Sequence, residues 1–195
     1  ENYLGRYEQA LADADNALAI NKDNQLNENL AAHFARACAL NRLHRSKEAL
    51  RDLQESEGLL SNATSYGQAE RELWSQYLDR EKCKAYMHLN MIEKARKIVD
   101  HNLELNAKQV WALRARAQIH MKGKALDQAL RDIDEALALE PYNNALLADR
   151  AQFMLAEHEP AKALEQLSKI PAKWRDARWK ELDAIARQML AREKQ

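Results

Sequence analysis

The decisive stretch of this sequence is ALDQALRDIDEALALEP, residues 125–141. Small and bulky apolar residues recur in it at fixed offsets, and most of its residues are strong helix formers. The stretch GRYEQALADADNALAI, residues 5–20, has the same pattern, and Ala49-Leu50 and Ala163-Leu164 open two similar segments. The chain is therefore expected to be an array of repeated helices.

These segments resemble the second helix, helix B, of the tetratricopeptide repeat (TPR) family, whose unit is a helix–turn–helix of about 34 residues. In the frame of that family, the small residue of helix B recurs at Ala10, Ala49, Ala95, Ala129 and Ala163. The small residue of the first helix, helix A, recurs at Ala37, Cys83, Ala117 and Ala151. The resemblance implies an all-α fold, a right-handed α-solenoid of antiparallel helix pairs.

The same frame divides nearly the whole chain. Residues 1–24 are a truncated first repeat that contains helix B, and four repeats follow at 30–63, 76–109, 110–143 and 144–177. Extra residues fall in Gln25–Asn29 and Ser61–Arg71, so that 64–75 is an insertion with the start of a long helix near Gln68. Residues 175–195 form a final amphipathic helix, because a solenoid needs a cap over its last interface.

One position departs from the commonest pattern of the family. The residue before the small residue of helix A is basic in every repeat: Arg36, Lys82, Arg116 and Arg150. A matching position in helix B is acidic three times, at Asp13, Asp52 and Asp132. We expect ion pairs between these helices, which fix the packing register more than they add stability. Solvated charges without fixed partners are the alternative.

The composition and motifs argue against several functions. Thirty Lys and Arg residues balance 30 Asp and Glu residues, so no net field draws the chain to nucleic acid. No stretch is apolar over the roughly 20 residues of a membrane span. No HExxH, GxSxG, phosphate-binding glycine loop or EF-hand loop occurs. We expect no enzyme activity, no cofactor and no metal, and we expect Cys38 and Cys83 to be free thiols.

Fixed positions of helix A line the concave surface of a TPR array. Carried over by position, they predict a partner-binding groove lined by Phe34, Asn41, Tyr77, Arg80, Lys84, Met87, Trp111, Arg114, Gln118 and Met121. Aromatic residues, Met and Arg are enriched at protein interfaces. The expected partner is a peptide or protein segment with acidic and apolar groups. The opposite expectation is that Phe34 and Trp111 pack under neighbouring helices and that the rest is ordinary surface.

Other functions stay open at this stage. One TPR subgroup grips a C-terminal carboxylate with Lys and Asn residues of three successive repeats, but the matching positions hold Arg80 and Lys84, then Ala115, then Ala145 and Asp149. That clamp is therefore disfavoured. The segment LSKIP, residues 167–171, is similar to repeat endings in bacterial exopolysaccharide exporters, so a structural periplasmic role in an envelope protein is an alternative. Self-association is a further one, and the cytoplasm is only slightly favoured over the periplasm.

Overall fold

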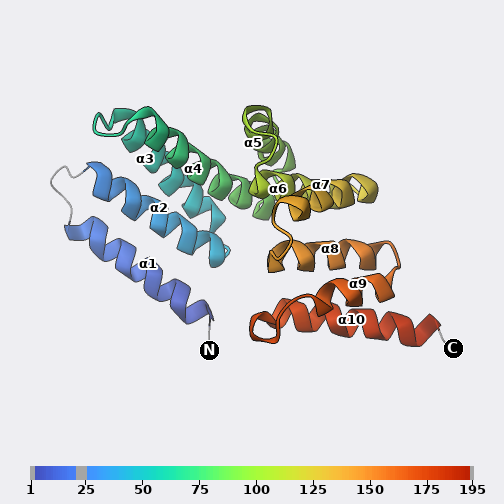
Figure 1. Ribbon diagram of the computed structural model, residues 1–195. Helices are drawn as coiled ribbons and strands as arrows, with labels where there is room; N and C mark the ends of the chain where they lie inside the picture. The colour runs from blue at the N-terminus through green and yellow to red at the C-terminus, as the bar shows by residue number, and fades with distance from the viewer. Residues whose placement is uncertain (1–2, 21–25, 194–195) are drawn as a thin grey trace. The chain divides into compact units, whose positions relative to one another are not determined.

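The computed structural model describes residues 3–20 and 26–193 (Figure 1). Within these ranges the chain is all-α, as the sequence predicted, and forms one 3₁₀ turn at Ala172–Trp174. Parts of the predicted segments 1–24, Gln25–Asn29 and 175–195 lie outside the described residues. The helices, in chain order, are α1 (Tyr3–Ile20), α2 (Leu26–Arg42), α3 (Ser46–Asn62), α4 (Gln68–His88), α5 (Ile92–Leu105), α6 (Val110–Lys122), α7 (Leu126–Leu139), α8 (Asn144–Ala156), α9 (Pro160–Ser168) and α10 (Ala177–Glu193).

The chain divides into two compact units, unit 1 (Glu1–Ile98) and unit 2 (Val99–Gln195). In unit 1 each of the helices α1 to α4 packs against the next, and α2 also touches α4. In unit 2 the helices α6 to α10 pack in the same sequential way, and α8 also touches α10. Contact between every second helix, in addition to neighbours, is the pattern that stacked helix pairs produce.

Small residues sit where the helices of a pair approach most closely. Ala37 and Ala49 in unit 1 and Ala117, Ala129, Ala151 and Ala163 in unit 2 are all 0% exposed. A side chain with only one methyl group lets two helix backbones come close, and larger apolar residues fill the space beside the contact. Leu53, Ile133 and Leu167, each four residues after the small residue of helix B, are also fully buried.

The turn between helix A and helix B has one conformation throughout. His44, Asn90, Lys124 and His158 have positive φ angles of 58°, 56°, 60° and 60°. Each lies five residues before the small residue of helix B, so the turns keep the repeat register. In every turn the next backbone N–H donates back into the preceding helix, for example from Ala125 to the His120 carbonyl at 2.9 Å. This hydrogen bond and the left-handed residue form a Schellman-type helix end.

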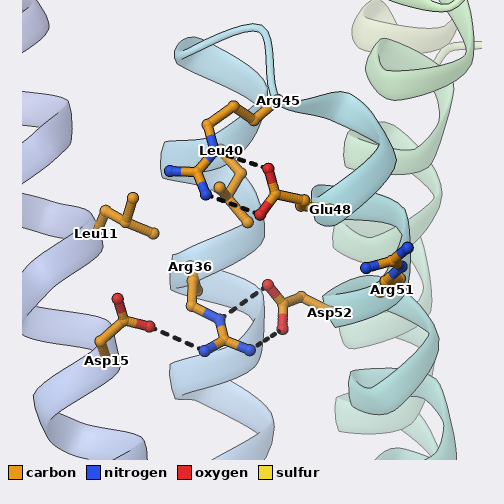
Figure 2. Close-up of a pocket in the computed structure, with 8 residues that line it drawn as sticks. All are labelled: Leu11, Asp15, Arg36, Leu40, Arg45, Glu48, Arg51 and Asp52. Carbon is orange, nitrogen blue, oxygen red and sulfur yellow. Dashed lines mark hydrogen bonds and ion pairs between the residues drawn. The ribbon is translucent and has the colours of Figure 1, made fainter.

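The expected ion pairs between helices are present. Arg36 of α2 donates to Asp52 of α3 through Nε (2.9 Å) and Nη2 (2.6 Å), and its Nη1 donates to Asp15 of α1 at 2.9 Å (Figure 2). Hydrogen bonding to Asp52 raises the pKa of the Arg36 guanidinium, so its charge is permanent. In unit 2, Arg116 makes the matching fork with Asp132, with an Nη2–Oδ1 distance of 2.7 Å.

Two of the basic residues use acids that the sequence frame did not indicate. Arg150 donates to Asp134 of the preceding helix B, with an Nε–Oδ1 distance of 2.6 Å, because the matching position of its own helix B holds Gln166. Lys82 pairs with Glu57 of α3. Asp13, which was expected to take part, instead accepts a hydrogen bond from Gln9 at 2.9 Å.

The final helix covers the end of unit 2. Leu182 and Ala186 of α10 are buried in one cluster with Leu147 and Leu167. The indole Nε1 of Trp179 donates to the Leu167 carbonyl at 2.9 Å, which ties α10 to the end of α9. Ile185, an apolar residue of the same helix, is 39% exposed.

The positive φ at Lys124 yields the first prediction. Lys124→Gly should raise the free energy of unfolding by about 1 kcal/mol, because glycine adopts this conformation without the steric cost of a Cβ atom. The matched control is Lys122→Gly at the end of α6, which should destabilise by up to about 1 kcal/mol, since glycine is a poor helix former. Urea unfolding measures both, and a destabilising Lys124→Gly would contradict the turn conformation.

A double-mutant cycle tests the charge pairing. Arg116→Met and Asp132→Asn should couple by on the order of 1 kcal/mol in urea unfolding, because the Asp132 carboxylate is buried and holds a forked hydrogen bond. The exposed pair Arg45–Glu48 is the control and should couple more weakly. Additive effects of Arg116→Met and Asp132→Asn would show that the two side chains do not act together.

Candidate functional site

Two hollows among the described residues of unit 1 lie on opposite faces of α2. Arg36 and Leu40 line the first hollow, whereas Cys38 and Arg42 line the second. Residues two apart on a helix point in nearly opposite directions, because each residue turns the helix by about 100°. The helix therefore separates the two hollows.

In the first hollow, most of the charged side chains pair with one another (Figure 2). It has a volume of about 240 Å³ and lies among α1, α2 and α3. Asp15 and Asp52 hold Arg36, and the Arg45 guanidinium and Glu48 carboxylate form a second forked pair. Because its carboxylates are already hydrogen-bonded to arginines, this hollow offers little to a cationic ligand.

The second hollow is larger and lies among α1, α2 and α4, with a volume of about 470 Å³. It unites four residues of the predicted groove with others from the same helices. Its lining is Tyr7, Ala10, Phe34, Ala35, Cys38, Ala39, Arg42, Tyr77, Arg80, Glu81 and Lys84. We call it the α2–α4 hollow.

Aromatic rings form one wall of the α2–α4 hollow. The Phe34 ring lies edge-on to Trp74, with centroids 5.5 Å apart, and 6.2 Å from the ring of Tyr77. Trp74 and Tyr77 are also edge-on to each other, at 6.1 Å. Phe34 is thus half-buried by packing, in part as the alternative expectation held, while Tyr77 remains 43% exposed. Rings held in this way present apolar surface at little entropic cost.

Charged side chains also line the same hollow, around Cys38. The pKa of the Cys38 thiol is raised to about 12, mainly by burial and also by Glu81, whereas Lys84, Arg42 and Arg80 act in the opposite direction. Four charged groups therefore lie near this one thiol. Three cations against one carboxylate leave an excess of positive charge, and Glu81 is already paired with Lys84.

Asn41 has a structural position rather than a surface one. It is 2% exposed, and its Nδ2 donates to the Glu81 carbonyl at 3.0 Å and to the Glu81 carboxylate at 3.1 Å. The predicted groove residue Asn41 thus joins α2 to α4 and orients Glu81. Met87, also on α4, is half-buried.

The predicted groove residues of unit 2 are partly occupied by their own neighbours. Arg114 donates from Nε to Asp149 at 2.5 Å, and Gln118 donates to the same carboxylate oxygen at 3.1 Å. The indole N–H of Trp111 is buried and has no acceptor among the described residues. Met121 is half-buried.

Several residues near the predicted groove were missed by sequence reasoning. Tyr7 and Ala10 belong to α1, a helix B, so the helix-A rule could not select them. Glu81 and Asp149 lie two residues before the small residue of helix A, a position that the rule does not include. An acid recurs at this position two repeats later, and that recurrence could have indicated that the position belongs to the groove.

Residues 3–20 and 26–193 contain no group of three or more His, Cys, Asp and Glu residues that could hold a metal ion. No described helix is long and apolar enough to cross a membrane.

Solved structures of other proteins show which fold this chain has. A thermophilic TPR protein of Thermus thermophilus, TTC0263, superposes with a TM-score of 0.70 at 19% identity, over 97% of this chain and 93% of that one. A TPR protein of Parabacteroides merdae gives 0.70 at 18%, over 97% and 68%. YrrB, described as a TPR protein with an unusual peptide-binding site, gives 0.50 at 16%, over 99% and 86%.

The chain therefore has the TPR fold, and the resemblance drawn from its repeat is confirmed at that level. No protein-family model and no curated protein matches the sequence.

The environment of the two cysteines gives a further prediction. Burial raises the pKa of both Cys38 and Cys83 to about 12, so at pH 8 both thiols are protonated and poor nucleophiles. We expect reaction with Ellman's reagent at least about 100-fold slower than for an exposed thiol with a pKa of about 8.5. The control is the same reaction in guanidinium chloride, where both thiols are exposed and should react at the normal rate. Fast labelling of the native chain would contradict this burial.

Proposed function

We propose that the protein is a non-catalytic interaction scaffold that binds a peptide or protein segment along its helix-A surface. The α2–α4 hollow is the observation that carries the proposal. It combines an aromatic wall, a floor of small side chains and a basic rim within one unit. Such a hollow suits an apolar side chain that anchors a segment, with acidic groups beside it.

The charge of the rim argues for acidic groups in the partner. Arg42 and Arg80 are both exposed, and no carboxylate among the described residues pairs with either of them. Arg42 lies 6.0 Å from the Tyr7 ring centroid, a cation–π contact that holds its guanidinium over the hollow. A carboxylate near these groups gains attraction without displacing an existing partner, and it speeds association at low salt.

The rest of the proposed groove follows the helix-A positions. Tyr77, Arg80 and Lys84 belong to the hollow itself, and Phe34 supports its aromatic wall. Met87 belongs to the proposed surface of unit 1, and the proposed surface of unit 2 consists of Trp111, Arg114, Gln118 and Met121. We leave out Asn41, because its amide is buried and bonded to Glu81. The peptide-binding site named for YrrB is in keeping with this function, in a protein of the same fold.

A charge reversal at the rim tests the proposal. A fluorescent peptide that alternates Glu with Phe or Leu is titrated into the full chain, and its anisotropy is followed. Arg80→Glu should weaken binding by at least roughly tenfold, because it turns a favourable contact into a repulsive one. Raising the salt concentration should weaken wild-type binding as well.

The matched control is Arg51→Glu. Arg51 is equally exposed in unit 1 but lines the first hollow, on the other side of α2. The same change of charge there should leave the affinity within about twofold, since only screened, long-range repulsion remains. Equal affinities for wild type and Arg80→Glu, or equal losses in the two variants, would refute binding at the α2–α4 hollow.

A further inference from the structure

Asp149 is a buried carboxylate on α8 that binds side chains from two other helices of unit 2, α6 and α10. It is only 1% exposed. Its Oδ2 accepts hydrogen bonds from Arg114 Nε at 2.5 Å and from Gln118 Nε2 at 3.1 Å, both on α6. Its Oδ1 accepts from Arg178 Nη2 on α10, and the same nitrogen donates to Gln152 Oε1 at 2.7 Å.

This cluster carries unbalanced charge. Arg114 and Arg178 are two permanent cations, whereas Asp149 is one carboxylate. The carboxylate is inaccessible, but the two arginine side chains are 31% and 37% exposed. A partner that approaches unit 2 at this point therefore meets positive charge, with the compensating negative charge buried beneath it.

Two acids near the cluster, Asp176 and Asp183, are engaged elsewhere, and Glu181, an exposed acid on α10, forms no ion pair with Arg178 among the described residues. Asp183 forms a forked pair with Arg187, with a closest distance of 2.7 Å. Asp176 accepts from the backbone N–H of Trp179 at 2.9 Å and so caps the start of α10. Neither acid is hydrogen-bonded to Arg114 or Arg178, so the excess of positive charge remains at the cluster.

The two guanidiniums also keep unused hydrogen-bond donors. Each guanidinium has five N–H groups in a rigid plane. Among the described contacts, Arg114 uses only Nε and Arg178 uses only Nη2. Since the existing bonds already fix both side chains, a further acceptor would bind without the usual loss of side-chain freedom.

We propose that unit 2 contains a subsite of its own, in addition to the α2–α4 hollow of unit 1. In this subsite Arg114 and Arg178 bind the carboxylate of an acidic side chain of the partner. The proposal rests on the proposed function, in which the helix-A surface binds the partner, and it extends that surface to Arg178 of α10. Asp149 is the positioning residue, because it aims both guanidiniums from beneath. Glu81 has the same place two repeats earlier in the chain, where it holds Lys84 of the α2–α4 hollow.

The test follows the arginine side chains directly. The full chain, labelled with ¹⁵N-arginine, is titrated with a hexaglutamate peptide while the Nε–Hε resonances are recorded by NMR. Arg114→Lys and Arg178→Lys assign the two signals. Both signals should shift in a saturable way, and Arg178→Lys should weaken the response at Arg114 by at least roughly threefold, because lysine keeps the charge but loses the planar fork.

Arg187 is the matched control, since it lies on the same helix and is balanced by its own carboxylate, Asp183. Its signal should stay in place, and Arg187→Lys should leave the titration unchanged. Equal shifts at Arg187, no shift at Arg114 and Arg178, or an undiminished affinity in Arg178→Lys would overturn the subsite. A response to inorganic phosphate without one to hexaglutamate would overturn the assignment to a carboxylate.

One variant separates this proposal from the function on which it rests. Arg80→Glu with Lys84→Glu disables the α2–α4 hollow but leaves unit 2 untouched. If hexaglutamate still shifts Arg114 and Arg178 in this variant, the subsite stands by itself. If the shifts vanish with the hollow, the subsite is not independent and the proposal is wrong.

Discussion

Close packing of helix A against helix B at an alanine is the constraint on which the rest of the structure depends. At Ala37 and Ala49, and again at Ala117 and Ala129, the side chain is completely buried. An added methylene or ring at such a contact would force the helices apart, at a cost of about 1–3 kcal/mol. Because these pairs keep the same contact, the packing of helix A against helix B is the same in both units.

The position of the candidate site follows from how α2 is packed. On α2 the buried contact fixes which side chains face α3 and which face α4. Arg36 is hydrogen-bonded to Asp15 and Asp52. On the opposite face of α2, Arg42 remains exposed and lines the α2–α4 hollow. The ion pairs therefore anchor one face of the helix and leave the cations of the other face to a partner.

Much of the fold could be predicted from the sequence, because repetition shows which positions share one environment. The start of α4 at Gln68 and the pairs Arg36–Asp52 and Arg116–Asp132 follow from the repeat frame. The site was harder to predict. Arg178 reaches Asp149 only because the irregular segment 169–176 places α10 beside α8, and no repeat pattern encodes that segment. The burial of Asn41 likewise depends on its contact with Glu81 of α4, which lies in another repeat.

Chemical-shift mapping of the peptide complex tests the central claim most directly. The claim is that the protein binds an acidic and apolar segment in the α2–α4 hollow. Titration of the ¹⁵N-labelled chain with the Glu/Phe peptide should shift the amide signals of Ala35, Cys38 and Tyr77, while those around Arg51 stay in place. Shifts confined to the Arg51 face, or spread evenly over unit 1, would contradict it.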